Sequence, residues 1–168
     1  YQKNFQCLID AFRLLTNDFP DWRLTIVGDG QDRASLEALI HESELGEKIS
    51  LAGEVTDLSQ FYAQASIFCL PSRWEGFPNA LAEAMAGGMP VVGFAGCDGV
   101  NILIDQSNGI LAEGIGDPSS LADALRRLMK DQALRDKMSA AAIQSVKKFA
   151  PPQIFDQWEQ LLKDAAAR

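Results

Sequence analysis

The amino-acid sequence predicts an α/β protein: an open, doubly wound parallel sheet with helices on both faces and an all-helical C-terminal end. The first observation is that apolar residues alternate between helical spacing and short runs of strand-forming residues. The second is that these runs are apolar throughout, as in sheets that helices cover on both faces. The third is that only helical spacing follows residue 117. Strands that alternate with helices form βαβ units, which give a Rossmann-like parallel sheet.

The predicted elements alternate along the first two thirds of the chain. Helices are expected over residues 5–15, around 36–40, over 58–65 and over 79–86, where Gly87-Gly88 breaks the last one. Strands are expected over residues 22–27, 49–52, 66–70, 90–94 and 108–111. The chain starts directly with a helix, whereas a doubly wound sheet should start with a strand. We therefore expect a first strand upstream of Tyr1, and residues 1–168 to be a single domain of a larger protein.

The end of the chain predicts helices alone. Asp117 before Pro118 is typical of a helix N-cap followed by a first-turn proline. Helical spacing then runs to residue 146, and Pro151-Pro152 starts a terminal helix with an apolar stripe. We expect this stripe to pack on the edge of the sheet; the alternative is partial docking against a neighbouring domain.

Composition excludes several classes of function. The net charge of −8 argues against nonspecific nucleic-acid binding, and no apolar run approaches the roughly 20 residues of a membrane span. Cys7, Cys69 and Cys97 are odd in number and far apart, which fits neither a disulfide framework nor a zinc site. The single histidine, His41, is expected to be exposed, and alone it builds no metal site. These features indicate a cytoplasmic protein.

Three loops are candidates for a ligand site, because doubly wound sheets bind ligands beyond the carboxyl ends of their strands. They cover residues 28–30, 53–55 and 71–78. In the third loop Gly76 lets the backbone approach a ligand closely, and Pro78 fits the first turn of the next helix. The N–H groups that open this helix suit a phosphate, and they belong to Asn79, Ala80 and Leu81.

Two carboxylates flank this helix start. Glu75 lies on the loop and Glu83 just over one turn inside the helix, so both could hold parts of one extended polar ligand. The alternative is structural: Glu75 caps the helix and Glu83 is a solvated helix residue. Spacing alone leaves both readings open.

The segment from Pro71 to Val92 resembles the E-x7-E signature of the group 1 family of retaining glycosyltransferases, which have a two-domain B-type architecture. The resemblance extends over roughly residues 3–130, and includes Lys3-Asn4-Phe5 and the Gly28-Asp29-Gly30 strand end. It implies that this chain is the C-terminal, donor-binding half of such an enzyme. With a missing N-terminal acceptor domain it would transfer a hexosyl group, with retention, to a saccharide, lipid-linked or other acceptor.

The resemblance also implies roles for individual residues. Glu75 would contact hydroxyls of the donor sugar, Glu83 the ribose, and Lys3 the diphosphate of the leaving nucleotide. The remaining donor-binding set would be Gly28, Gly53, Glu54, Val55, Ser72, Gly76, Phe77, Asn79, Ala80 and Leu81. The sequence contains no Asp-x-Asp pair, so we expect no metal and no cofactor besides the nucleotide-sugar substrate. Any membrane contact would come through the missing domain.

Some features depart from the family pattern, and other functions remain open. The family's phosphate-binding arginine would lie upstream of Tyr1, Pro78 replaces a common glycine, and residues 96–101 lack the usual glycine-rich, glutamate-bearing pattern, which leaves Asn101 without an assigned role. One alternative is a non-catalytic nucleotide-sugar-binding module. Another is an epimerase or phosphorylase of the same architecture, although His41 is poorly placed for an epimerase, and no lysine between Ser72 and Gly88 serves a phosphorylase.

Overall fold

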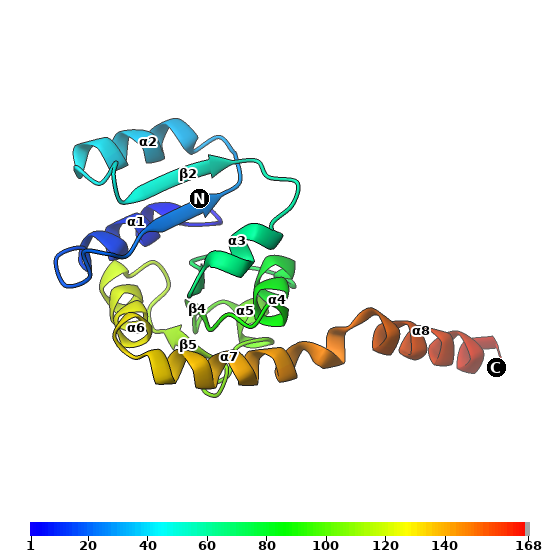
Figure 1. Ribbon diagram of the computed structural model, residues 1–168. Coiled ribbons are helices and arrows are strands. Elements are labelled where there is room, and N and C mark those ends of the chain that lie inside the picture. The colour runs from blue at the N-terminus through cyan, green and yellow to red at the C-terminus, as the bar shows by residue number, and fades with distance from the viewer. Residues whose placement is uncertain (167–168) are drawn as a thin grey trace.

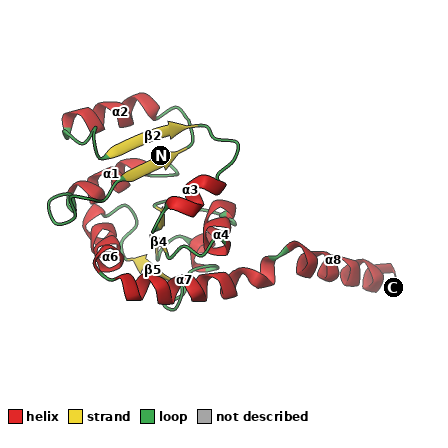
Figure 2. Ribbon diagram, viewed as in Figure 1, coloured by secondary structure: helices red, strands yellow, loops and turns green. Residues whose placement is uncertain are grey.

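The computed structural model describes residues 1–166 and confirms the predicted fold class (Figures 1 and 2). The strands are β1 (Leu24–Val27), β2 (Ile49–Gly53), β3 (Phe68–Leu70), β4 (Val91–Phe94) and β5 (Gly109–Ala112). The helices are α1 (Phe5–Arg13), α2 (Arg33–Glu42), α3 (Ser59–Gln64), α4 (Asn79–Ala86), α5 (Asp98–Asn101), α6 (Pro118–Lys130), α7 (Gln132–Val146) and α8 (Pro151–Ala166), with a 3₁₀ turn at Lys147–Phe149. Most boundaries fall close to the predicted ones, but the short helix α5 was not predicted.

The strands are parallel and form two pieces. β1 pairs with β2, with Leu24 opposite Ile49, while β3, β4 and β5 pair in that order. Within the described residues no strand joins β1 to β3 by backbone hydrogen bonds. The sequence predicted one open parallel sheet. In the structure the described strands form two parallel pieces that are not hydrogen-bonded to each other.

A shared hydrophobic core holds the two halves together. Its buried side chains include Ile26 and Ile49 from the first piece and Val92, Phe94 and Ile110 from the second. Helices α1 and α6 pack together on this side. On the other side α4, α5 and α7 cover a second apolar cluster around Met85 and Val100. Helices therefore cover both faces, as the apolar strands predicted.

The helical end begins as its sequence predicts. The Asp117 carboxylate accepts a hydrogen bond from the Ser119 N–H at 2.9 Å, and Pro118 occupies the first helical position of α6. Asp131 caps α7 in the same way through the Leu134 N–H, at 2.9 Å. Each cap satisfies a backbone donor that the helix cannot satisfy itself.

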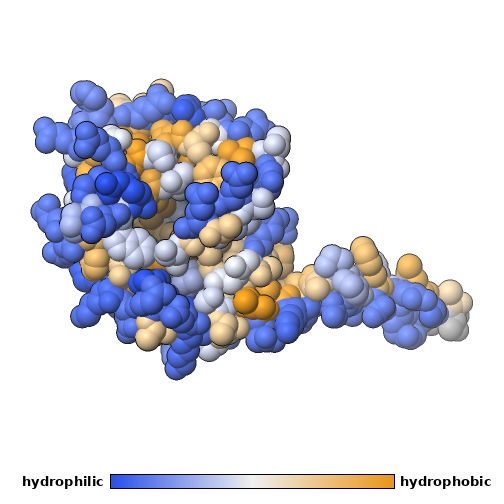
Figure 3. Space-filling model, viewed as in Figure 1, coloured by the Kyte–Doolittle hydropathy of each residue, from blue (hydrophilic) through white to orange (hydrophobic). Residues whose placement is uncertain are grey.

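The terminal helix α8 does not pack on the sheet edge, so that expectation was wrong. It projects away from the body of the molecule (Figure 1), and none of its described side chains is buried. Apolar residues alternate with hydrophilic ones along it (Figure 3), and Phe155 is 68 % exposed. The cause is local: Ala150 is extended, as residues before proline prefer, and this redirects the chain after α7.

No described helix combines the length and apolar character of a membrane span.

Candidate functional site

The loop after β3 is attached to the start of the chain by three hydrogen bonds. The Asn4 side-chain amide donates to the Pro71 carbonyl at 3.1 Å, and the Arg73 N–H donates to the Gln2 carbonyl at 2.9 Å. The Gln2 side-chain amide donates to the Trp74 carbonyl at 3.0 Å. Residues that are far apart in the sequence thus form one hydrogen-bonded segment beside the carboxyl end of β3.

This segment brings Lys3, Ser72 and Glu75 together. The Glu75 Oε1 atom lies 2.7 Å from Lys3 Nζ and accepts a second hydrogen bond, also of 2.7 Å, from the Ser72 hydroxyl. The side chain of Glu75 is only 10 % exposed and that of Lys3 is 52 % exposed, while Ser72 is fully buried. The Glu75 Oε2 atom has no hydrogen-bond partner among the described residues, so it can accept from a ligand hydroxyl.

Helix α5 supports the backbone on which Glu75 lies. A Cβ atom on Gly99 would lie 2.4 Å from the Glu75 carbonyl oxygen and 2.5 Å from that of Gly76. Only glycine permits this approach of α5 to the loop. A Cβ atom on Gly76 itself would meet nothing within 4 Å, so the folded chain does not require a glycine at that position.

The start of α4 differs in detail from the expectation. Pro78 lies at the N-cap with an extended backbone, one residue before the first helical turn. Its carbonyl accepts hydrogen bonds from the N–H groups of Leu81, at 3.0 Å, and Ala82, at 3.2 Å. The prediction that Leu81 offers a free N–H was therefore wrong. The N–H groups of Asn79 and Ala80 have no hydrogen-bond partner in the described part of the chain.

Glu83 lies on the exposed face of α4 with one side-chain partner. The Tyr62 hydroxyl, on α3, donates to Glu83 Oε2 at 3.2 Å. Burial, and secondarily the Glu83 charge, raises the pKa of Tyr62 to about 12, so the phenol stays protonated further into the alkaline range than an exposed tyrosine does. No sequence pattern pointed to Tyr62, because its contact depends on how α3 packs beside α4.

Phe77 connects the loop to the segment before α8. Its ring is 42 % exposed and packs edge-on against Phe149, with 5.1 Å between the ring centroids. Phe149 closes the 3₁₀ turn from which α8 departs. The loop is therefore in contact with the base of the projecting helix.

The ends of β1 and β2 meet at two glycines. The Gly28 N–H donates to the Gly53 carbonyl at 2.7 Å, and both residues have positive φ values, 121° and 74°. The next residues are Glu54, which is exposed and whose carboxylate has no hydrogen-bond partner among the described residues, and Val55, which is half-buried. Among the described residues no hydrogen bond joins this loop to Glu75 or Glu83.

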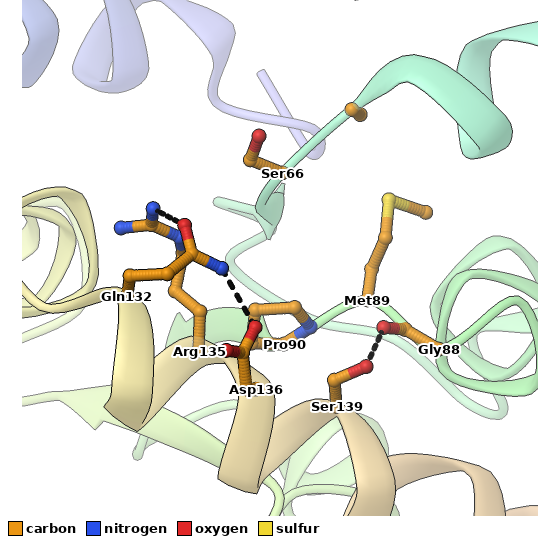
Figure 4. Close-up of a pocket in the computed structure, with 9 residues that line it drawn as sticks. Ser66, Gly88, Met89, Pro90, Gln132, Arg135, Asp136 and Ser139 are labelled. Atoms are coloured by element: carbon orange, nitrogen blue, oxygen red, sulfur yellow. Dashed lines mark hydrogen bonds between the residues drawn. The ribbon is translucent and has the colours of Figure 1, made fainter.

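A separate hollow lies at the opposite, amino end of β3 and β4 (Figure 4). It measures about 170 Å³ and is lined by residues including Ser66, Met89 and Ser139. Its only lining cation, Arg135, already donates to the carbonyl of Met129 at 3.1 Å. Among the described residues no group of three or more His, Cys, Asp or Glu side chains could hold a metal ion. The carboxyl-end loops remain the candidate site.

Comparison with known proteins shows the family. Residues 1–145 match the family described as glycosyl transferases group 1. The chain belongs to this family. An uncharacterized glycosyltransferase of Haemophilus influenzae is 30 % identical over 161 residues, which cover 95 % of this chain and 45 % of that protein.

Solved structures place the chain within group 1 glycosyltransferases. The pneumococcal O-GlcNAc transferase GtfA, described in complex with UDP and GlcNAc, matches with a TM-score of 0.87 and 25 % identity over 99 % of this chain and 34 % of GtfA. The C-terminal domain of the group 1 protein LpcC from Francisella tularensis matches with a TM-score of 0.78 and 26 % identity over 88 % of this chain and 79 % of that domain. The chain spans less than half of the Haemophilus protein and of GtfA, and corresponds to the C-terminal portion of group 1 glycosyltransferases.

One departure from the group 1 pattern has a structural explanation. The Asn101 side-chain amide donates to the Ala95 carbonyl and so closes the turn that leads into α5. Asn101 thereby stabilises the helix on which the Glu75 loop rests.

Proposed function

We propose that this chain binds a nucleotide-diphosphate sugar with the loop and helix over residues 72–83, and that it transfers the sugar, with retention, together with an N-terminal acceptor domain. The observation that carries the proposal is the Lys3–Glu75–Ser72 arrangement, which joins a cation to a carboxylate with a free oxygen. A sugar hydroxyl and a phosphate need these two groups close together. Membership of the group 1 glycosyltransferases supports the same assignment.

In this proposal, hydrogen-bond donors of the protein, without a metal ion, stabilise the negative charge that develops on the leaving diphosphate. The Lys3 ammonium and the N–H groups of Asn79 and Ala80 are the donors that the described site offers. Fixed donors of this kind stabilise charge that develops in a transition state. Glu75 would then orient the sugar, and Glu83 would accept hydrogen bonds from the ribose.

We further propose that a strand upstream of Tyr1 completes the sheet between β1 and β3. Two observations support this: each of these strands has an edge without a described partner, and their side chains share one core. The exposed apolar residues of α8, such as Phe155 and Trp158, would contact the neighbouring domain. The isolated chain should bind donor and transfer no sugar, and turnover by this chain alone would contradict the two-domain part of the proposal.

A calorimetric panel of nucleoside diphosphates and their sugars tests the site. UDP is the first probe, because GtfA is described with UDP bound. Glu75→Gln should weaken the nucleotide-sugar, and Glu83→Gln the nucleotide, each by about tenfold or more, since hydrogen bonds to a charged group contribute about 1.5–3 kcal/mol. Glu42→Gln, at an exposed position on α2, is the matched control. Unchanged affinity in both site variants would show that the assignment is wrong.

A further inference from the structure

Glu83 has a long side chain on an exposed helix face, and one described contact orients it. The Tyr62 hydroxyl lies 3.2 Å from Glu83 Oε2 and 3.4 Å from the Ala80 carbonyl oxygen. The hydroxyl has a single hydrogen, and the carboxylate is both the nearer and the more strongly attracting acceptor. The Glu83 Oε1 atom has no hydrogen-bond partner among the described residues.

Tyr62 is itself held in place by the second apolar cluster. Its ring packs edge-on against Phe68 of β3, with 6.3 Å between centroids and an angle of 62° between the planes. The base of its side chain lies beside the end of α4, where a Cβ atom on Gly87 would be 3.8 Å from the Tyr62 Cβ. A half-buried ring anchored to the sheet thus presents its hydroxyl at the surface, where Glu83 meets it.

We infer that Tyr62 is a positioning residue, which fixes the Glu83 carboxylate in the orientation that receives the ribose hydroxyls. This inference rests on the proposed function, in which Glu83 binds the ribose. A free glutamate samples many rotamers, and fixing one before binding removes part of the entropy loss that binding otherwise causes. The phenol is suited to the task because it is protonated at neutral pH and its hydroxyl lies 3.2 Å from the Glu83 carboxylate.

The test compares ligands that differ only in the ribose hydroxyls. The nucleoside diphosphate that binds most tightly among ADP, CDP, GDP and UDP is titrated calorimetrically beside its 2′,3′-dideoxy counterpart. Tyr62→Phe keeps the ring against Phe68 and removes only the hydroxyl. It should weaken the ribose-containing ligand about three- to tenfold, the range expected for one hydrogen bond, and leave the dideoxy ligand unchanged. Tyr1→Phe, at the other tyrosine of the chain, should change neither affinity.

The outcomes separate this inference from the proposed function. If Glu83→Gln abolishes the preference for the ribose hydroxyls and Tyr62→Phe leaves it intact, the inference is overturned and the proposed function stands. Equal weakening of both ligands by Tyr62→Phe would also overturn the inference, because it indicates a general structural effect. If Glu83→Gln keeps the full preference, or if no nucleoside diphosphate binds, the ribose assignment itself fails.

Discussion

The Lys3 ammonium and the Glu75 carboxylate form an ion pair of 2.7 Å across 72 positions of sequence. One partner precedes α1 and the other follows β3, so their meeting depends on the whole intervening α/β unit. About half of the Lys3 side chain is exposed to solvent. Screening by water therefore makes the contribution of the ion pair to stability small. The pair places a cation beside a carboxylate whose second oxygen has no hydrogen-bond partner among the described residues.

Replacing Lys3 should affect binding far more than folding. In Lys3→Ala the free energy of unfolding should fall by about 1 kcal/mol, because the lysine is half-exposed and Glu75 keeps its hydrogen bond from Ser72. Affinity for the nucleoside diphosphate should fall about tenfold or more, because the cation that faces the diphosphate is lost. Denaturant unfolding and calorimetry on the same preparation check both values. Lys137→Ala, at an exposed position on α7, should leave both unchanged, and equal affinity in the two variants would remove Lys3 from the site.

Adding one methyl group at Gly99 should displace the Glu75 loop. The new Cβ would lie 2.4–2.5 Å from two backbone carbonyl oxygens, which cannot rotate away as a flexible side chain could. We expect Gly99→Ala to lose about 1–3 kcal/mol of stability, as overpacking usually does. Donor affinity should fall with it, measured below the unfolding transition. Gly46→Ala is the matched control, since a Cβ atom there meets nothing within 4 Å; normal donor affinity in Gly99→Ala would show that α5 does not position the loop.

Removing the cap of α6 should destabilise the chain without touching the site. Asp117→Ala should cost about 1 kcal/mol, the typical contribution of an N-cap side chain. For a chain of this size that corresponds to a fall in Tm of roughly 2–4 °C. Asp123→Ala, inside the same helix, removes only an exposed pair with Arg126 and should stay within about 0.5 kcal/mol. Thermal unfolding that ranks the two variants in the opposite order would contradict the role of the cap.

The thiols of Cys7 and Cys69 should be inert in the folded chain. Burial is the main cause that raises the pKa of Cys7 to about 11, and burial also raises that of Cys69. Because the thiolate is the reactive form, at pH 8 only about one Cys7 thiol in a thousand would be available to a disulfide reagent. Labelling monitored by mass spectrometry should leave both residues unmodified in buffer and modify them fully in denaturant. Rapid labelling of either in the native chain would contradict this burial.

The raised pKa of Tyr62 predicts how this residue affects stability at high pH. The folded pKa of Tyr62, about 12, lies above the ordinary value of 10, so between these values the folded state binds more protons than the unfolded state. The contribution of Tyr62 to stability should therefore be constant below pH 10 and should be lost as the pH rises from 10 to 12. Tyr62→Phe should show a shallower fall in that window, measured by denaturant unfolding at each pH. An identical slope in both proteins would show that Tyr62 ionises normally.

Elements with local signals were predictable from the sequence. Helix α4 begins and ends at the predicted residues, because Gly87-Gly88 closes it, and Asp117 and Pro118 start α6 as their residue types require. The resemblance led us to expect Lys3 and Glu75 in one site, and the structure places them in contact; their roles toward a ligand stay predictions.

Features that depend on packing between distant segments were not predictable. Gly99 under the Glu75 loop and Tyr62 beside Glu83 follow from how α5 and α3 are placed, which no local pattern encodes. An apolar stripe shows that a helix needs a partner, but not which partner, and α8 was misplaced for that reason. The hydrogen bond from the Leu81 N–H to the Pro78 carbonyl was missed because Pro78 was placed one position too far into the helix.

Four strand edges have no described partner; the proposed upstream strand would fill those of β1 and β3, which leaves the edges of β2 and β5 open. A free edge carries backbone donors and acceptors that can pair with any extended segment, including the same edge of another copy. At neutral pH the net charge of −8 keeps copies apart. Near the isoelectric point of about 4.6 that repulsion disappears, so the onset of aggregation on acidification should occur there rather than at the pH of global unfolding.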